Sequence, residues 1–456
     1  MARTPKATSD CAKLVEQALL DAGLTGARVV VGLSGGMDSV ALLHALVQVA
    51  PALGVTPSAL HVHHGLSPRA DAWARSCTEL CRALGVTFTE VRVHVDHRSK
   101  LGVERAAREA RYAVFKQQRA DAIALAHHAD DQAETVMLQL LRGAGVHGLS
   151  AMPTTRALNS ATGLLLVRPW LRLPRAQIHT YAQLAGLPWI EDESNRDLAF
   201  DRSFLRMCIL PGLVARFPGL TETFGRAARN FADAVQLLDE LAARDAQGGG
   251  VGDSLSVSAL AALSPAGARN LLRWFLERRG LPAPSRDQLE EALRQGLAAR
   301  GDAQLRVKLG AVWLRRHRGR LYLQPAGREP ARGWSLTWSG EDELVLPGGL
   351  GRLRFEPARG TGLSLERLRA QSVAVRSRAG GERLRLAPNR PSRTLKNLLH
   401  EAAIPEWERG FLPLLFVGEV LVWVPAVGQD FRFAAAAEEP SVMPRWEREA
   451  RVPAQG

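Results

Sequence analysis

The chain has 456 residues, of which 46% are hydrophobic and 23% charged, so it is long enough for about three globular domains and has no disordered composition. Its formal net charge of +13 favours a polyanionic partner, because Lys and Arg release counterions from phosphates, although a general excess of solubilising charge is the alternative. With no signal-peptide stretch, no run of about 18 apolar residues and four scattered cysteines, the sequence predicts a cytoplasmic protein with no membrane span and no disulfide framework (Cys11, Cys77, Cys81, Cys208).

Short β-rich runs alternate with helical patterns from residue 27 to about 170, which is typical of an α/β domain with a parallel sheet covered on both faces. We expect strands at 28–33, 59–63, 87–95, 121–126 and 164–167, and helices near 39–49, 70–84, 103–119 and 131–141. Ligands bind such sheets at the carboxyl ends of the strands. Gly35-Gly36, His63-His64-Gly65 and His127-His128 follow three of these strands, so we expect them to line one crevice.

The stretch Ser34-Gly35-Gly36-Met37-Asp38-Ser39 stands between the first strand and a helix start, which is the arrangement of an anion site. Its glycines let backbone N–H groups approach a phosphate, and its serine hydroxyls can donate to the same oxygens. Asp38 is placed to hold Mg²⁺ near a departing polyphosphate. The Gly-Lys-Ser/Thr ending of the Walker loop is absent. A purely structural turn with Asp38 or Ser39 as helix cap is the alternative.

The rest of the chain predicts further domains around this first one, which we assign to residues 1–212. A mostly helical middle domain is expected at 213–330, with a hairpin formed by 304–309 and 311–316. Residues 331–371 are expected to be a linker and edge segment, because they begin in a stretch rich in Gly, Arg and Pro. A small α+β domain is expected at 372–440, followed by a tail at 441–456.

A run of basic side chains marks the expected C-terminal domain. Between residues 373 and 399 there are seven Lys or Arg and one acid, Glu382. This density favours a phosphate-contacting surface, although single-sign runs are also found as solvated faces. The basic residues that we expect to bind RNA there are Arg376, Arg378, Arg383, Arg393 and Lys396.

In their order along the chain, the motifs resemble those of the tRNA(Ile)-lysidine synthetase family, whose first domain is an N-type ATP pyrophosphatase of the PP-loop superfamily. The resemblance rests on the 34–39 loop, His63-His64-Gly65-Leu66, Ala107-Arg108-Glu109-Ala110-Arg111-Tyr112 and Ala126-His127-His128-Ala129-Asp130-Asp131-Gln132-Ala133-Glu134-Thr135. It continues through Arg168-Pro169, Asp192-Glu193-Ser194-Asn195, residues 202–211 and the basic C-terminal segment. The chain departs from the family at Ser203, where Arg-Asn is the common pair for Arg202-Ser203.

This resemblance implies that ATP adenylates the C2 oxygen of the wobble cytidine in a CAU-anticodon isoleucine tRNA, and that free L-lysine then displaces AMP. ATP and Mg²⁺ are then expected on the 34–39 loop, with Mg²⁺ held through Asp38. Asp131 and Glu134 are expected to bind lysine, although their spacing also fits a capping box. His127 is expected to contact the α-phosphate or AMP, Arg108 or Arg111 to supply charge, and Arg202 and Arg206 to contact the tRNA backbone. His128 is expected to be packed or structural.

Three readings compete with this one. A tRNA thiolase would share the loop but needs a reactive cysteine pair, and the helical spacing of Cys77 and Cys81 does not provide one. A nonenzymatic RNA-binding module would not require Asp38, Asp131 and Glu134 together. A zinc site built from His63, His64, His127 and His128 lacks the usual ligand spacing. The sequence leaves open whether the chain forms a homodimer.

Overall fold

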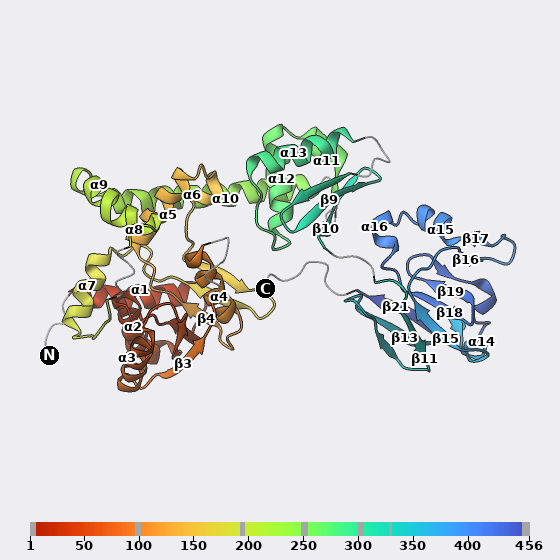
Figure 1. The fold of residues 1–456 in the computed structure, drawn as a ribbon, viewed down its shortest axis with the longest axis horizontal. Coiled ribbons are helices and arrows are strands. Elements are labelled where there is room, and N and C mark those ends of the chain that lie inside the picture. Colours follow the sequence, from red (N-terminus) through yellow and green to blue (C-terminus); the bar gives the residue numbers. More distant parts are fainter. Residues whose placement is uncertain are drawn as a thin grey trace. The chain divides into compact units, whose positions relative to one another are not determined.

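The structure is a computed structural model that describes residues 6–95, 102–191, 197–247, 254–299, 305–327 and 331–448 (Figure 1). The chain divides into two compact units, Met1–Leu238 and Asp239–Gly456. Within the described segments, no single helix has both the length and the apolar composition needed to cross a membrane, although the bent pair Asp201–Arg216 and Leu220–Gln247 passes when its members are taken together.

A six-stranded sheet in the order β3-β2-β1-β4-β6-β5 forms the centre of the first unit. All neighbouring pairs are parallel except β5 with β6, so the predicted parallel sheet is confirmed. The antiparallel edge strand β5 was not predicted, because its sequence Thr-Arg-Ala-Leu-Asn lacks an apolar alternation. The strands are β1 (Arg28–Gly32), β2 (Thr56–His63), β3 (Thr87–Arg92), β4 (Ala122–Ala124), β5 (Thr155–Asn159) and β6 (Leu164–Val167).

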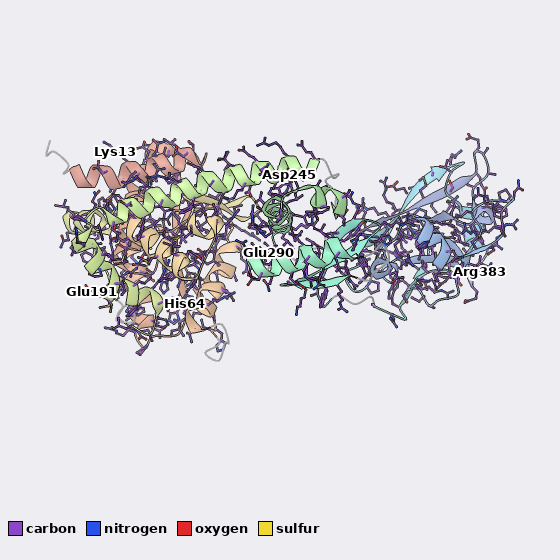
Figure 2. All side chains as sticks on the ribbon, turned by 90° about the horizontal axis from the view of Figure 1, so that it is seen from above. Lys13, His64, Glu191, Asp245, Glu290 and Arg383 are labelled. Carbon is purple, nitrogen blue, oxygen red and sulfur yellow. The ribbon has the colours of Figure 1, made fainter. Side chains whose placement is uncertain are left out.

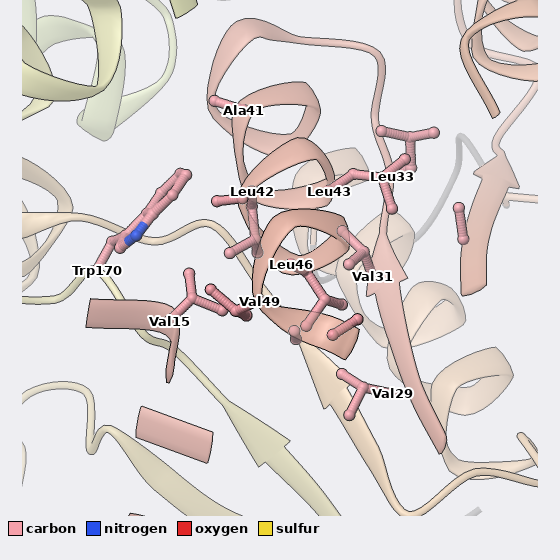
Figure 3. Packing of buried hydrophobic residues seen from close by; sticks show 14 of the residues in the cluster. Val15, Val29, Val31, Leu33, Ala41, Leu42, Leu43, Leu46, Val49 and Trp170 are labelled. Carbon is pink, nitrogen blue, oxygen red and sulfur yellow. The ribbon is translucent and has the colours of Figure 1, made fainter. Parts of the chain in front are cut away.

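Both faces of this sheet are buried, because alternate residues of a strand point to opposite sides. Val29 and Val31 of β1 pack into one hydrophobic cluster with α1 (Lys6–Asp21), α2 (Met37–Leu53), α3 (Ala70–Ala83) and α7 (Arg175–Leu184). Figure 3 shows part of this cluster around Leu42, Leu43 and Leu46 of α2. Val30 faces the other way and packs with Phe115 of α4 (Val103–Lys116). This double packing holds the carboxyl ends of the strands in fixed register.

The helices that follow the sheet complete the first unit. Helix α5 (Ala129–Leu141) follows β4, and α6 (Val146–Leu149) precedes the edge strand β5. A helical run then comprises α8 (Asp201–Phe204), a π-helical turn (Leu205–Ile209), α9 (Leu210–Arg216) and α10 (Leu220–Gln247), which continues into the second unit. Single π-helical turns are rare and are frequent at functional sites.

The first part of the second unit packs helices on an antiparallel sheet in the order β7-β10-β9-β8. The predicted hairpin is confirmed by the pairing of β8 with β9. Two helices of this part begin at serine caps, because Ser264 accepts a hydrogen bond from the Gly267 N–H and Ser285 forms a capping box with Gln288. The elements are β7 (Ser254–Ser256), α11 (Val257–Ala262), α12 (Pro265–Glu277), α13 (Arg286–Ala298), β8 (Arg306–Leu309), β9 (Val312–His317) and β10 (Arg320–Pro325).

Two antiparallel sheets form most of the rest of the second unit, in the orders β11-β15-β18-β19-β20 and β12-β13-β21-β14. Their strands are β11 (Ser335–Trp338), β12 (Glu343–Val345), β13 (Arg352–Arg359), β14 (Leu363–Ser364), β15 (Val373–Arg376), β18 (Leu414–Val417), β19 (Val420–Val424), β20 (Gly428–Gln429) and β21 (Pro440–Glu447). The smaller elements are α14 (Leu365–Arg369), β16 (Arg383–Leu384), β17 (Arg393–Thr394), α15 (Leu395–Glu401), α16 (Glu406–Arg409) and the 3₁₀ turn Phe431–Phe433.

Two segments differ from the expectation for this region. Residues 331–371, expected to be a linker and edge segment, contain β11 to β14. The expected tail at 441–456 begins inside β21, which pairs with β13 over eight residues from Arg352↔Glu447 to Arg359↔Pro440. Pairing between strands about ninety residues apart leaves no local signal, and the many Gly and Arg residues conceal the apolar alternation.

Candidate active site

The loop after β1 has the backbone of an anion site. Gly35 has a φ of +86°, and a Cβ there would lie 3.1 Å from Ile190 Cδ1 and 3.2 Å from Cys77 Sγ, so only glycine fits. Gly36 has an ordinary φ of −72°, and the nearest atom to a Cβ would be Ser34 Oγ at 3.5 Å. The packing of the protein therefore does not require glycine at 36. The space beside it is available to a ligand that approaches the N-terminus of α2.

Hydroxyl groups brace this loop. Ser34 Oγ lies 3.0 Å from Ser39 Oγ, and Ser39 Oγ donates to the Gly36 carbonyl at 2.9 Å. The Gly36 N–H donates to Ser34 Oγ at 3.3 Å. Met37 packs its side chain into the core, so it can offer a phosphate only its backbone N–H. The two serines thus hold the loop open before any ligand binds.

Asp38 follows on the first turn of α2 with its side chain 27% exposed. Its Oδ2 lies 3.5 Å from Arg175 Nε and 3.9 Å from His128 Nε2. Its Oδ1 is buried and has no hydrogen-bond partner among the described residues. A buried carboxylate oxygen without a partner costs free energy unless a bound group interacts with it. Carboxylate oxygens are the atoms that Mg²⁺ prefers to bind. The residues at this point therefore fit a bound Mg²⁺.

His128 connects this loop to the next strand end. Its imidazole is buried at the start of α5, with Nε2 3.3 Å from Asp131 Oδ2 and Nδ1 3.5 Å from Asp130 Oδ2. Burial lowers the pKa of His128, but the hydrogen bond to Asp130 and the charges of Asp131 and Asp38 outweigh it and raise that pKa. The expected packed position of His128 agrees with its burial. Its contact with Asp38 is not expected from the sequence, since no local pattern pairs positions 38 and 128.

Helix α5 begins two residues earlier than the predicted 131–141. Its N-cap is His128, and Asp131 occupies the third helical position, where its Oδ2 accepts a hydrogen bond from the His128 N–H at 3.1 Å. The alternative with Asp131 as cap and Glu134 as its partner is therefore wrong. The sequence did not indicate this because His is not a preferred N-cap residue, whereas Asp is.

Asp131 and Glu134 form a buried acidic pair, with the Glu134 side chain 1% exposed. The Arg206 guanidinium occupies the pair, with Nε 2.6 Å from Glu134 Oε1 and Nη2 2.9 Å from Glu134 Oε2 and 3.3 Å from Asp131 Oδ1. Burial raises the pKa of Glu134, and Arg206 opposes this without cancelling it. Burial acts in the same direction on Asp131, but the charge of His128 and the hydrogen bond from the His128 backbone N–H outweigh it and lower that pKa.

Three other basic residues expected at the site also have defined contacts. Arg202 donates to Thr135 Oγ1 at 2.9 Å, so it is held beside the acidic pair. Arg108 lies over the Tyr112 ring at 4.9 Å, whereas Arg111 donates from Nε to His64 Nε2 at 3.4 Å. Sequence reasoning gives no role to Arg168, which donates from Nε to His127 Nδ1 at 3.3 Å. The only signal for it is the place of the Arg168-Pro169 motif directly after a strand end.

Several alternatives find no support in this geometry. His63 contacts Asp71 at 3.2 Å, and His63, His64, His127 and His128 form no metal-binding group within the described segments. Burial raises the pKa of Cys77 to about 12 and that of Cys81 to about 11, so neither is a reactive thiolate. The motif Asp192-Glu193-Ser194-Asn195 lies outside the described residues.

The basic run of the C-terminal region is more balanced than its sequence indicates. Arg376 pairs with Glu419 at 3.1 Å, Arg378 with Glu382 at 3.5 Å, and Arg393 with Glu401. Arg383 and Lys396 are exposed, and Figure 2 shows Arg383 among the side chains of this region. Arg383 donates to the Ser392 carbonyl at 2.6 Å. Two of the three paired acids come from outside residues 373–399.

Comparison with known proteins covers most of the chain. Residues 5–213 match the PP-loop domain, 255–322 the TilS substrate binding domain and 373–446 the TilS substrate C-terminal domain. The tRNA(Ile)-lysidine synthase of Nitrosomonas europaea is 43% identical over 421 residues, which are 92% of each chain. The chain belongs to the tRNA(Ile)-lysidine synthase family.

A second relative agrees with membership of the tRNA(Ile)-lysidine synthase family. The enzyme of that name from Azoarcus sp. is 42% identical over 92% of this chain and 91% of its own. Among solved structures, the U34-tRNA thiolase NcsA from Methanococcus maripaludis has a TM-score of 0.43 and 19% identity, covering 50% of this chain and 80% of its own.

Proposed function

We propose that the chain ligates free L-lysine to C2 of the wobble cytidine of the CAU-anticodon isoleucine tRNA, with ATP converted to AMP and pyrophosphate. Family membership supports this activity. The structural observation that carries it is the His128 imidazole, whose Nε2 lies 3.9 Å from Asp38 on the glycine loop and 3.3 Å from Asp131 of the acidic pair. A nucleotide and an amine bound at these two points would meet in one crevice.

In the first half of the reaction, the loop of residues 34–39 binds the ATP phosphates. The backbone N–H groups near Gly36 and the α2 N-terminus face the phosphates, and the Ser34 and Ser39 hydroxyls orient them. Asp38 would hold Mg²⁺, which would supply positive charge against the departing pyrophosphate. The cytidine C2 oxygen attacks the α-phosphorus, a P–O bond forms, and the bond to pyrophosphate breaks.

In the second half, the lysine amine attacks C2, the C2–O bond breaks and AMP leaves. The side-chain ammonium has a pKa near 10.4, so making the free amine at neutral pH costs about 4.6 kcal/mol unless the site accepts the proton. The position of Arg206 supports the acidic pair as the binding site of the lysine ammonium, because the Arg206 guanidinium lies between the two carboxylates. The raised pKa of Glu134 makes it the better proton acceptor of the pair.

We propose that the incoming lysine takes the place of Arg206, whose guanidinium then becomes free for an RNA phosphate. Arg206 lies on the π-helical turn, and its side chain is 38% exposed, so it has a path to solvent. Arg202, Arg108 and His127 are proposed to stabilise the charge that develops on the adenylated base. Among the C-terminal residues, Arg376, Arg378, Arg383, Arg393 and Lys396 are proposed to bind the tRNA backbone.

The decisive experiment is incorporation of labelled lysine. Purified protein is incubated with ATP, Mg²⁺, labelled lysine and a CAU-anticodon tRNA transcript, and AMP, pyrophosphate and labelled tRNA are measured. We expect the three products in equal amounts, and no labelling of a transcript with a different wobble base. Labelling by a sulfur donor with none by lysine would assign a thiolase instead. Binding of tRNA with no pyrophosphate release would reduce the protein to an RNA-binding module.

A further inference from the structure

Arg168 is a buried cation whose place in the site is set by neighbouring strands. It follows β6, which pairs in parallel with β4, and His127 lies three residues beyond the end of β4. Arg168 is 2% exposed. Its Nη1 donates to the Pro153 carbonyl at 2.8 Å, and its Nε donates to His127 Nδ1 at 3.3 Å. Its side chain also hydrogen-bonds to Tyr112, and within the described ranges no carboxylate pairs with it. Burying a guanidinium without an acid is costly, which favours a functional reason for its position.

The direction of the hydrogen bond from Arg168 to His127 determines the state of the imidazole. A guanidinium has donors and no acceptor, so the Nδ1 of His127 must be unprotonated to accept from it. The ring proton of His127 must then be on Nε2. An imidazolium has donors at both nitrogens and could not accept this bond. Geometry alone therefore makes His127 a neutral hydrogen-bond donor.

The surroundings of His127 act in the same direction. Burial lowers its pKa to about 3, with smaller contributions from the positive charges of Arg168, Arg202 and Arg108, while Asp131 opposes the shift. These groups come from four different segments of the first unit, namely residue 168 after β6 and helices α8, α4 and α5. At neutral pH the His127 side chain is therefore uncharged. Its Nε2–H can donate a hydrogen bond, and its Nδ1 lone pair is already used by Arg168.

We infer that Arg168 is a positioning residue that holds His127 as the neutral Nε2–H tautomer, so that His127 donates to a substrate oxygen and does not accept the lysine proton. The substrate oxygen belongs to the chemical class of phosphate or phosphoryl-activated carbonyl oxygens. This role rests on the proposed function for its substrate, but the tautomer and its dependence on Arg168 do not. Proton acceptance is thereby left to the acidic pair across the site.

The test is nitrogen NMR of the full-length protein with ¹⁵N-labelled histidine, with His127→Gln used to identify the His127 signals. We expect the Nε2–H pattern for wild type, unchanged between pH 5.5 and 8.5. Arg168→Met removes every donor at similar length, and His127 should then populate both tautomers, with only part of its pKa shift lost because burial still lowers that pKa. Arg168→Lys keeps a cation and a donor and should restore part of the wild-type pattern.

Arg156→Met is the matched control. Arg156 lies 5.4 Å over the Tyr112 ring, and none of its described contacts is with His127. It should leave the His127 signals unchanged. A protonated or Nδ1–H His127 in wild type would overturn the inference, as would an unaltered His127 in a folded Arg168→Met protein. In the lysine assay, Arg168→Met should lower kcat about 10- to 100-fold with little change in the lysine KM. If no variant ligates lysine while the NMR outcomes hold, the proposed function fails and the Arg168 assignment stands.

Discussion

The candidate active site and the basic C-terminal run both contain many charges, but they arrange them in opposite ways. In the active site the charges are buried and share partners, so that His128 contacts three carboxylates and Arg206 contacts two. In the C-terminal run each paired arginine has its own acid, and two of these acids are exposed, Glu419 at 89% and Glu401 at 55%. Buried charges depend on one another, whereas exposed pairs contribute about 0–1 kcal/mol each. Substitutions should therefore have large and specific effects in the active site, and small and additive effects in the C-terminal run.

The largest expected effect is that of Asp38→Asn on pyrophosphate release. The change keeps the volume but removes the carboxylate whose Oδ1 has no partner among the described residues. We expect at least a ~1000-fold loss of pyrophosphate release with tRNA binding intact, because electrostatic stabilisation of the leaving group is lost. The matched control is Asp121→Asn, which removes an acid directly before β4, at the amino ends of the parallel strands. Equal losses in both variants would refute the assignment of Asp38.

Glu134→Gln should separate lysine binding from adenylation. It removes the negative charge that meets the amine, so the lysine KM should rise about 100-fold while pyrophosphate release changes much less. Steady-state rates at varied lysine concentration measure this split. Glu109→Gln is the control, because it breaks an exposed Arg–Glu pair on α4. Since Glu134→Gln also removes the main acid partner of Arg206, the melting temperature is measured in parallel, and Glu134→Asp provides a second variant.

The pH dependence of stability should also come from the first region. Burial and the charge of Arg111 lower the pKa of His64 from 6.5 to about 4. The neutral form of His64 is thus favoured in the folded state. Its contribution to the free energy of unfolding is present above pH ~6.5 and is lost as the pH falls toward 4. This contribution is at most about 3 kcal/mol. Denaturant unfolding between pH 4 and 8 should show a weaker slope for His64→Gln than for wild type. His400→Gln, at an exposed position in α15, should keep the wild-type slope.

The smallest single effects are expected in the C-terminal region. Replacing Arg383 and Lys396 by Gln should reduce the slope of log tRNA affinity against log salt by about 0.7–0.9 for each phosphate that these side chains neutralise. Arg393→Gln should change it less, because Glu401 already neutralises that side chain. Filter binding at several salt concentrations measures both variants and the wild type. An identical slope for wild type and the double variant would remove this surface from the tRNA interface.

The sequence was sufficient wherever the evidence is local. The strand, glycine turn and helix start around 34–39 lie within about fifteen residues, and the alternation of β-rich runs with helical patterns predicts both the parallel sheet and the crevice at its carboxyl edge. The caps at Ser264 and Ser285 were predictable for the same reason, since a cap involves residues three apart. Candidate residues at 38, 127, 131 and 134 followed from motifs next to strand ends.

The partners of those residues were decided by tertiary structure. Arg206 on Glu134, Arg168 on His127 and His128 beside Asp38 join positions 41 to 90 residues apart, and β21 meets β13 over a comparable distance. Such contacts depend on strand order and on how closely helices approach, which no local pattern encodes. Protonation states follow from the same contacts, because burial and neighbouring charge set a pKa. The chain therefore determines by itself which chemical groups are available, and folding determines which of them act together.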